Sequence, residues 1–351
     1  MFIRNCWYVA AWPHEVGSTP LARTLLDEPV VLYRLPDGTP VALEDRCCHR
    51  DLPLSMGEVC EDRIVCRYHG LAYDRTGRCV NIPAQEQIPE NARVRSYPLV
   101  ERDGVVWIWM GETALADADA IVPYPWHQDA GWAYRSGYYR IAGHHQLIND
   151  NLIDLSHVGW VHRKTIGGTP TAHSAAKMST ERDGDVVHVR RWLPDTVPPP
   201  TYVRAVGFTG TIDRYMQISF RPGLIHIYVG ANDAGKGVDE VTCNNTFGGR
   251  IFNGITPETA TTTHYFFSAA HSFRVTEPAV TDAFFAEIIT TFEEDKVVIE
   301  AQQTRHVPGR RQVGILSDAG GVQARRVMAE RLAAEHPGAP TGQVIGIHAV
   351  G

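Results

Sequence analysis

The chain is 351 residues long, which is enough for two domains or for one domain with a large insertion. Its hydrophobic fraction of 44% and charged fraction of 21% are ordinary for a globular enzyme. The net charge of −7 with no cluster of Lys and Arg argues against nucleic acid as a partner, and no apolar run is long enough to cross a membrane.

The N-terminus and the cysteines indicate a reducing compartment. Residues 1–8 contain neither the basic region nor the apolar run of a secretory signal, and the seven cysteines lack the spacing of a disulfide framework. Two cysteines are interpreted below as ligands. The others are interpreted as buried or free thiols: Cys6, Cys48, Cys60, Cys79 and Cys243. A cytoplasmic location is therefore expected.

The first part of the chain, residues 1–115, is predicted to be a small antiparallel β domain, because short β runs alternate there with turn residues. Expected strands at 29–35 and 41–44 flank Pro36-Asp37-Gly38, a sequence typical of a hairpin turn. The run 104–111 is expected to be a buried closing strand.

Two Cys-His doublets lie within this first domain. Cys-Cys-His occupies residues 47–49 and, after sixteen further residues, Cys-Arg-Tyr-His occupies residues 66–69. Each doublet is expected on its own hairpin loop and supplies one thiolate and one imidazole. This set fits a Rieske [2Fe-2S] cluster, in which two imidazoles replace two thiolates on one iron. The candidate ligands are Cys47, His49, Cys66 and His69.

A structural zinc site is the alternative interpretation of the doublets, since two Cys and two His also bind zinc. Zinc modules usually place their Cys pair and their His pair on separate elements, however, whereas here the two residue types alternate.

The second domain is assigned to residues 116–351, after a Pro-rich and acidic stretch at 112–126. It is expected to contain a helical segment at about 145–162, several strands between 185 and 270, and helices at about 279–304 and 319–336. This order predicts an α+β fold in which helices pack against a curved antiparallel sheet.

Asp154, His157 and His162 form a second candidate site on the first helical segment. Asp154 and His157 are three residues apart and share a helix face. His157 and His162 point about 140° apart on an ideal helix, so they converge on one ion only if the helix loosens between them. Gly159 is placed to permit this. Two imidazoles without a metal are the alternative.

The helix at 279–304 supplies the missing carboxylate. Asp295 falls at about 20° on a helical wheel, inside an apolar arc of about 80°. That arc contains Phe284, Ile288, Phe292 and Ile299, and it excludes Glu293, Glu294 and Glu300. A carboxylate aimed into a core must be paired, protonated or bound to metal. Asp295 would complete a 2-His-1-carboxylate site for mononuclear non-haem Fe(II) with open positions for O₂; pairing with an Arg or capping of a loop is the alternative.

With both ligand sets in place, the chain resembles the Rieske non-haem iron oxygenases over nearly its full length. The family motif E/D-x₃-D-x₂-H-x₄-H is matched by Asp150, Asp154, His157 and His162. Within the family, the chain is most similar to the group of vanillate and dicamba O-demethylases. The stretches that carry this similarity are 255–259, 264–267, 294–301 and 318–320.

The resemblance implies a Rieske domain and a helix-grip catalytic domain in a homotrimer, where the cluster of one subunit serves the iron of its neighbour. Asp154 would connect the two centres by hydrogen-bonding His157 in its own subunit and His69 of the adjacent one. The implied reaction is O-demethylation of a methoxylated aromatic acid similar to vanillate, using O₂ and releasing formaldehyde. Electrons from NAD(P)H would come through a separate flavin and iron–sulfur reductase, because this chain has no dinucleotide-binding motif.

Substrate contacts are predicted at Asn151, Asn253 and His264. For Asn151, an amide on the helix face is the alternative. Dicamba-type members have a His where this chain has Asn253, and Arg-Asn where it has His-Ser at residues 271–272, so the substrate is left open.

Other reactions and another protein class are also compatible with these motifs. Methyl hydroxylation of an arene, N-demethylation and ring dihydroxylation use the same two centres, although the group motifs argue against the last. A Rieske electron carrier with a ligand-binding second domain is the alternative from a different class. Such a carrier would hold two irons per chain, those of its cluster, and an oxygenase one more.

Overall fold

The computed structural model describes residues 1–83, 85–238, 245–307, 310 and 312–337. The described chain forms two compact units. The first comprises Phe2–Pro123 together with Thr256–Ala260, and the second comprises Tyr124–Ile255 and the residues from Thr261 onwards. No helix within these described residues is long and apolar enough to span a membrane.

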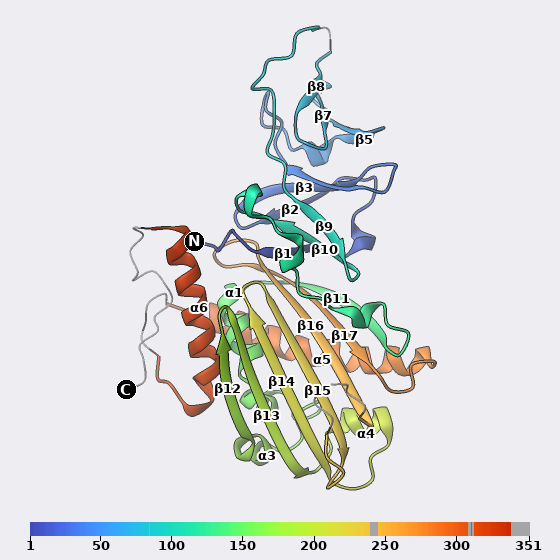
Figure 1. Ribbon diagram of the computed structural model, residues 1–351, viewed down its shortest axis with the longest axis vertical. Coiled ribbons are helices and arrows are strands. Elements are labelled where there is room, and N and C mark those ends of the chain that lie inside the picture. The colour runs from blue at the N-terminus through green and yellow to red at the C-terminus, as the bar shows by residue number, and fades with distance from the viewer. Residues whose placement is uncertain (84, 239–244, 308–309, 311, 338–351) are drawn as a thin grey trace. The chain divides into compact units, whose positions relative to one another are not determined.

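The first unit is built from short antiparallel strands. Their sheet orders are β1-β10-β9, β2-β3-β4 and β5-β6-β7-β8 (Figure 1). The strands are β1 Trp7–Ala11, β2 Leu21–Leu25, β3 Glu28–Arg34, β4 Pro40–Glu44, β5 Glu58–Cys60, β6 Arg63–Val65, β7 Ala72–Asp74, β8 Cys79–Asn81, β9 Leu99–Arg102 and β10 Val105–Trp109. Short 3₁₀ turns accompany them: η1 Pro13–Glu15, η2 Leu54–Met56, η3 Thr113–Leu115 and η4 Ala118–Ala120.

The predicted hairpin and closing strand of this unit are confirmed. The turn between β3 and β4 contains Gly38 at a φ of 88°, a conformation that glycine adopts without strain. β10 is buried at every residue, because it lies between β1 and β9 in its sheet. Cys6, Cys48, Cys60 and Cys79 carry free thiols, as expected, whereas Cys243 lies outside the described residues.

The second unit contains an antiparallel sheet with the order β11-β17-β16-β15-β14-β13-β12. Its strands are β11 Ala133–Ile141, β12 Lys177–Asp183, β13 Val186–Thr196, β14 Ile212–Arg221, β15 Leu224–Asp233, β16 Phe247–Pro257 and β17 Thr263–His271. Its helices are α1 His145–Ile153, α2 Val158–Val161, α3 Pro170–Ala175, α4 Pro200–Val206, α5 Pro278–Gln303 and α6 Ala319–Glu335, with 3₁₀ turns η5 Pro125–His127, η6 Leu155–His157 and η7 Leu316–Asp318.

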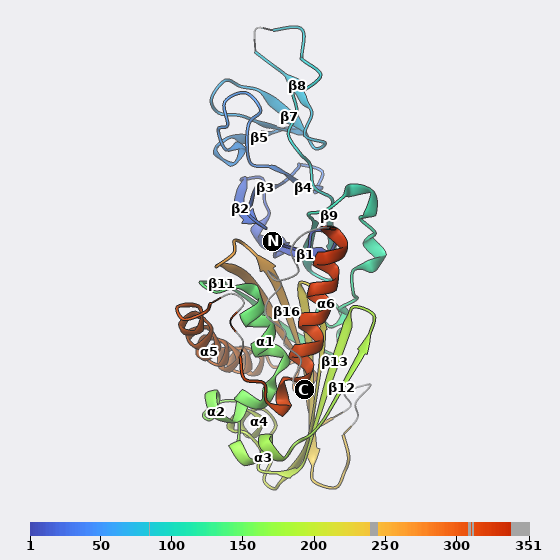
Figure 2. The same ribbon diagram turned by 90° about the vertical axis from the view of Figure 1, so that its left-hand side faces the viewer.

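Helices α1 and α5 pack against one face of this sheet, α1 on β14 and α5 on β11 and β17 (Figures 1 and 2). The face is suited to them because the strands present aromatic side chains there. Phe292 of α5, for example, lies with its ring 4.9 Å from that of Phe267 and 5.6 Å from that of Tyr265. The layer between α5 and the sheet is therefore an aromatic core, and it positions the candidate iron ligands described below.

The predicted α+β class is confirmed, and so are the two long helices, as α5 and α6. The expected helix at 145–162 is wrong in its continuity. α1 ends at Ile153, Asp154 is extended at φ −99° and ψ 95°, and η6 and α2 then follow as separate turns. Strands β11 and β12 and the short helices α3 and α4 were not predicted.

Candidate metal centres

The two Cys-His doublets occupy loops of the same construction, which confirms that each has its own loop. In loop 47–52 the N–H of the first residue donates to the carbonyl of the last at 2.8 Å, and the N–H of the fifth donates to the carbonyl of the first at 3.0 Å. Loop 66–71 repeats both hydrogen bonds, at 2.8 and 3.0 Å. The fifth residue has a positive φ in both loops, 56° at Asp51 and 73° at Gly70, so both loops reverse tightly around their ligands.

The four candidate cluster ligands divide into a buried pair and an exposed pair. The thiols of Cys47 and Cys66 are 2% and 1% exposed, whereas His49 and His69 are exposed and their ring centroids lie 4.5 Å apart. The hydroxyl of Tyr73 lies 3.1 Å from the Sγ of Cys47, within hydrogen-bond reach of a sulfur ligand. Two sulfurs inside and two imidazoles at the surface match the donor set of a Rieske [2Fe-2S] cluster, so the residues fit that group.

Burial has a consequence for the Cys66 thiol. It raises the pKa of Cys66, and the neighbouring thiol of Cys47 raises it further, whereas the N–H groups of Tyr68 and His69 lower it. A thiol in this setting is a poor nucleophile at neutral pH, but metal binding deprotonates it. The site is therefore suited to holding a cluster and poorly suited to thiol chemistry.

The break at Asp154 brings the two histidines of the second unit together. The Asp154 carboxylate accepts hydrogen bonds from the N–H and Oγ of Ser156, both at 2.8 Å, and from the Oγ of Ser317 at 3.0 Å. It thereby caps the turn that follows α1. The predicted hydrogen bond between Asp154 and His157 is made by the main chain, whose carbonyl oxygen lies 2.6 Å from Nδ1 of His157.

Gly159 does not loosen the helix, contrary to the sequence-based expectation. It lies inside α2, and a Cβ placed on it would approach the Cα of Pro170 to 2.8 Å. The residue is glycine because α2 and α3 pack closely, and the change in direction occurs before His157 instead.

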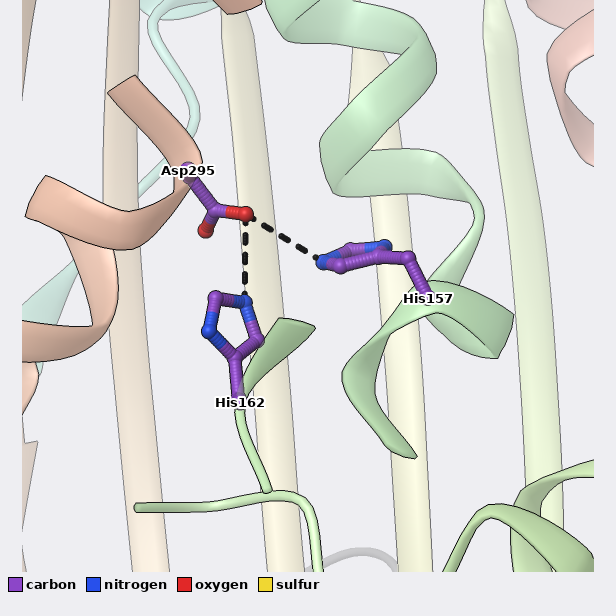
Figure 3. A group of neighbouring side chains, drawn as sticks. All are labelled: His157, His162 and Asp295. Atoms are coloured by element: carbon purple, nitrogen blue, oxygen red, sulfur yellow. Dashed lines mark ion pairs between the residues drawn. The ribbon is translucent and has the colours of Figure 1, made fainter. Parts of the chain in front are cut away.

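Figure 3 shows His157, His162 and Asp295 converging on one point. One ligand atom from each lies within 4.8 Å of the others. Oδ1 of Asp295 is 3.4 Å from Nε2 of His157 and 3.1 Å from Nε2 of His162. The prediction that the Asp295 carboxylate points into the core is confirmed, because the residue is 7% exposed. Its ion-pair partners are these two imidazoles and no arginine among the described residues.

The hydrogen bonds behind the two rings indicate that a cation belongs between them. Nδ1 of His157 faces a carbonyl, and Nδ1 of His162 faces the Glu294 carboxylate at 2.7 Å. Both acceptors require an N–H at Nδ1, so in the neutral rings the Nε2 lone pairs point at Asp295. Two lone pairs and a carboxylate oxygen repel one another unless a proton or a metal ion lies between them. Two imidazoles and one carboxylate suit Fe(II), so the residues fit that ion.

Without a metal, a proton takes this place. Burial disfavours the charged form of His162, but hydrogen bonds to Asp295 and Glu294 outweigh it and raise the pKa of His162 above 6.5. Burial likewise opposes ionisation of Asp295, yet its hydrogen bonds with both histidines hold the pKa of Asp295 well below its usual value. Iron binding must therefore displace a proton from this group, so iron affinity should fall as the pH drops through the pKa of His162.

Sequence reasoning missed two residues that hold the ligands. Glu294 orients His162, although its position off the apolar arc of the helix excluded it. Asn151, a predicted substrate contact, donates its Nδ2–H to Oδ1 of Asp295 at 3.0 Å and leaves its own Oδ1 buried without a hydrogen-bond partner. Asn151 therefore positions a ligand carboxylate, a role that the spacing to His157 gives no means of predicting.

We expect Glu294→Gln to weaken Fe(II) binding by about 10- to 100-fold, because the amide keeps the acceptor and removes the charge that makes His162 basic. It also lowers the pKa of His162, so proton competition should begin at a lower pH. Competition titration with an Fe(II) chelator measures both effects. The titration is repeated from about pH 5.5 to about pH 8, because this range spans the ordinary pKa of histidine. Glu293→Gln, one residue earlier and more exposed, is the control; equal affinities for the two variants would contradict the role of Glu294.

A cavity adjoins the three candidate iron ligands. His157, His162 and Asp295 line it together with apolar and aromatic side chains from α5 and from strands β14, β15 and β16. Arg214 of β14 also lines it, and its guanidinium was not singled out from the sequence. The site thus combines a metal-ligand set with a mostly apolar pocket, which is the usual form of a small-molecule site.

Asn253 and His264 are not among the residues that line this cavity, and the substrate contacts predicted for them stay predictions. Asn253 is fully buried, its Nδ2–H donating to the carbonyl of Ile225 at 3.0 Å and its Oδ1 accepting from Tyr265 at 2.7 Å. His264 directly precedes Tyr265 on β17, so its side chain lies on the opposite face of the sheet, away from α5, and its Nδ1 lies 2.8 Å from the hydroxyl of Tyr138. Both side chains stabilise the sheet.

Comparison with known proteins gives the following relatives. The model of the Rieske [2Fe-2S] domain matches residues 6–98, and that of the vanillate O-demethylase oxygenase C-terminal domain matches residues 141–334. The chain is 39% identical to the toluene-4-sulfonate monooxygenase system iron-sulfur subunit of Comamonas testosteroni, over 96% of this chain and 99% of that protein. It is 36% identical to a vanillate O-demethylase oxygenase subunit of Pseudomonas sp. (strain HR199 / DSM 7063), over 97% of each. The crystal structure of dicamba monooxygenase bound to 3,6-dichlorosalicylic acid superposes with a TM-score of 0.90, at 31% identity, over 96% of this chain and 99% of that one.

Proposed function

The chain belongs to the Rieske non-haem iron oxygenases of the vanillate O-demethylase group, and from this premise we propose that it O-demethylates a methoxylated aromatic acid. It is the oxygenase component of a Rieske monooxygenase system, and in this proposal a separate flavin and iron–sulfur reductase supplies electrons from NAD(P)H. The observation that carries the proposal is the cluster of His157, His162 and Asp295 on the wall of an apolar cavity.

The chemistry available to the chain follows from its two cofactors, because the [2Fe-2S] cluster supplies single electrons and Fe(II) activates O₂ when they are bound. Cys47, His49, Cys66 and His69 would hold the cluster, and His157, His162 and Asp295 would hold the iron. In the overall reaction a methoxyarene, O₂, NADH and a proton give a phenol, formaldehyde, NAD⁺ and water. The new hydroxyl on the former methyl carbon makes a hemiacetal, which breaks between that carbon and the oxygen on the ring, so the oxygen stays on the ring as the phenol and the carbon leaves as formaldehyde.

The residues of the second unit prepare this reaction by position. Glu294 and the carbonyl of Asp154 fix the two imidazole rings, and Asn151 holds the carboxylate of Asp295. His157, His162 and Asp295 all line the cavity, so a metal ion held by them would adjoin the space for O₂ and substrate. The apolar wall excludes water and packs an aromatic ring, so that one substrate carbon is presented to the metal.

Electron delivery is the part of the proposal that involves more than one chain. We assign residues 1–115 to the cluster and 116–351 to the iron, and place the cluster of one subunit beside the iron of the next in a homotrimer. His69 is exposed, and Asp154 lines a depression that is also lined by His157. These positions support a contact between His69 of one subunit and the Asp154 carboxylate of another. The free thiols of the first unit support a cytoplasmic location.

A second reaction, hydroxylation of an aryl methyl group, is favoured by one observation. The relative at 39% identity is named for toluene-4-sulfonate, an arene that carries a methyl group and no methoxy group. The same iron site and cavity would serve either reaction, because both begin at a methyl carbon attached to the substrate.

Turnover with defined substrates tests the proposal and separates the two reactions. The iron-loaded protein would receive NADH, a reductase from a related system and either vanillate or toluene-4-sulfonate, and formaldehyde, phenol and benzylic alcohol would be quantified. We expect vanillate to give formaldehyde and phenol in equal amounts. Alcohol from toluene-4-sulfonate with no formaldehyde from vanillate would replace O-demethylation by methyl hydroxylation, and oxidation of neither compound class would contradict both.

A further inference from the structure

Arg214 is a buried cation in the wall of the cavity and has no negative partner among the described residues. It is 3% exposed and lines the same cavity as His157, His162 and Asp295. Its guanidinium reaches only uncharged acceptors, and at long distances: the carbonyls of Ile166 and Gly167 at 3.3 and 3.5 Å, the hydroxyl of Tyr202 at 3.5 Å and the sulfur of Met216 at 3.9 Å. Its Nε has no hydrogen-bond partner. Among the described residues, no carboxylate forms an ion pair with it.

Two other arginines of the same unit have a carboxylate partner. Arg325 donates to both oxygens of the Asp150 carboxylate, and Arg191, which is as buried as Arg214, lies 3.9 Å from a carboxylate oxygen of Asp154. A buried cation without an anion is unfavourable, since uncharged acceptors replace only part of its hydration. Arg214 therefore has unused hydrogen-bonding capacity for a negative group, and its side chain is part of the cavity wall.

The side chain of Arg214 is also held in place for such a group. Its guanidinium carbon lies 4.8 Å from the centre of the Tyr202 ring, and that ring stacks on Phe247 with centroids 3.7 Å apart. A guanidinium fixed on an aromatic face keeps its planar fork of N–H donors, which binds two oxygens of one anion at once. Tyr202 and Phe247 line the cavity as well, so the wall beside the cation is aromatic.

We propose that Arg214 binds the anionic group, a carboxylate or a sulfonate, of the aromatic substrate. This inference rests on the proposed function and adds the residue that selects the substrate class. The anion pairs with Arg214, the ring packs on the aromatic and apolar wall, and the methyl carbon faces the ligands His157, His162 and Asp295. A neutral analogue leaves the buried cation unpaired and is therefore bound less tightly than the acid.

The test is equilibrium binding, measured by calorimetry on the iron-loaded protein without reductant, so that no turnover occurs. The ligands are vanillate, toluene-4-sulfonate and the neutral methyl ester of vanillate. We expect Arg214→Gln to weaken binding of one or both anions by about 10- to 100-fold, the range for a hydrogen bond to a charged group, and to leave the ester unaffected. Arg214→Lys should bind the anions with an affinity between those of the wild type and Arg214→Gln, because lysine keeps the charge but lacks the planar set of N–H donors. Arg190→Gln is the control, because Arg190 of β13 is partly exposed, pairs with Glu181 and does not line the cavity.

The outcomes separate a role in recognition from a structural one. If Arg214 only supports the loop at 166–167, Arg214→Gln weakens acid and ester equally and lowers the thermal unfolding temperature, and the proposal is overturned. It is also overturned if the wild type binds neither anion. If Arg214→Gln weakens binding of only vanillate or only toluene-4-sulfonate, the result identifies whether the substrate anion is a carboxylate or a sulfonate. Because no turnover is measured, a loss of anion binding in Arg214→Gln supports this inference even if the demethylation assay fails. Conversely, if demethylation is normal but the acid and the ester bind equally well, this inference is wrong and the proposed function still stands.

Discussion

Asp295→Asn should reduce substrate turnover by about a thousandfold or more, because a neutral amide cannot balance the charge of Fe²⁺ between two imidazoles. Iron content should fall by one ion per chain, while the visible and electron paramagnetic resonance spectra of the Rieske cluster stay unchanged. Activity, iron content and spectra are measured on the same preparation. The cluster spectrum serves as the internal test of folding, since its ligands belong to the other unit of the chain.

The matched control for this variant is Asp282→Asn. The substitution is the same and the residue lies on the same helix, but Asp282 is exposed and pairs with Arg135 at 2.8 Å. It should retain its iron and nearly full activity. If Asp295→Asn also retained all its iron and its turnover, the carboxylate would not be a ligand, and the assignment of the iron site would be wrong.

Asp154→Asn should lower steady-state turnover by about a hundredfold, because in the proposed homotrimer it removes the charge that connects the two centres while both ligand sets remain. The amide oxygen can still accept from the N–H of Ser156, and His157 is held by the main-chain carbonyl of residue 154, so iron content should not change. Rapid mixing of the reduced protein with O₂ and substrate measures the step directly: the cluster should reoxidise about a hundredfold more slowly.

Ser317→Ala is the control, since it removes one hydrogen bond to the same carboxylate and keeps the charge. Its reoxidation rate should stay close to that of the wild type. Fast cluster reoxidation in Asp154→Asn would show that electrons reach the iron by another route, and the proposed contact between His69 and Asp154 of different subunits would then lose its support.

The ligand residues could be predicted from the sequence because their evidence is local. The two doublets carry their own spacing, and the helical periodicity of 279–304 places Asp295 among apolar residues before any tertiary structure is known. The break at Asp154 could not be predicted with the same means, since an Asp inside an apolar periodic segment is compatible with either a continuous helix or a cap. The structure shows the cap, on Ser156.

The surroundings of the iron site depend on contacts between distant segments. Glu294 lies on α5 and contacts His162 at the end of α2, more than a hundred residues earlier in the chain. A helical wheel of α5 alone cannot show this contact. The sheet face on which His264 lies could not be predicted, because the parity of a strand is fixed only by its packing. Arg214 lies in a strand with ordinary sequence, and its unpaired charge becomes visible only when every neighbouring acceptor is known.

Iron and acid-labile sulfide in the anaerobically purified chain test the central claim most directly, namely that one chain holds both a Rieske cluster and a mononuclear iron. We predict about three irons and two sulfides per chain, two irons with the cluster and one at His157, His162 and Asp295. If the chain holds only two irons and two sulfides, even after incubation with Fe(II), then it contains the cluster but no mononuclear iron, and it would be an electron carrier instead of an oxygenase. Zinc without sulfide would contradict the Rieske cluster itself.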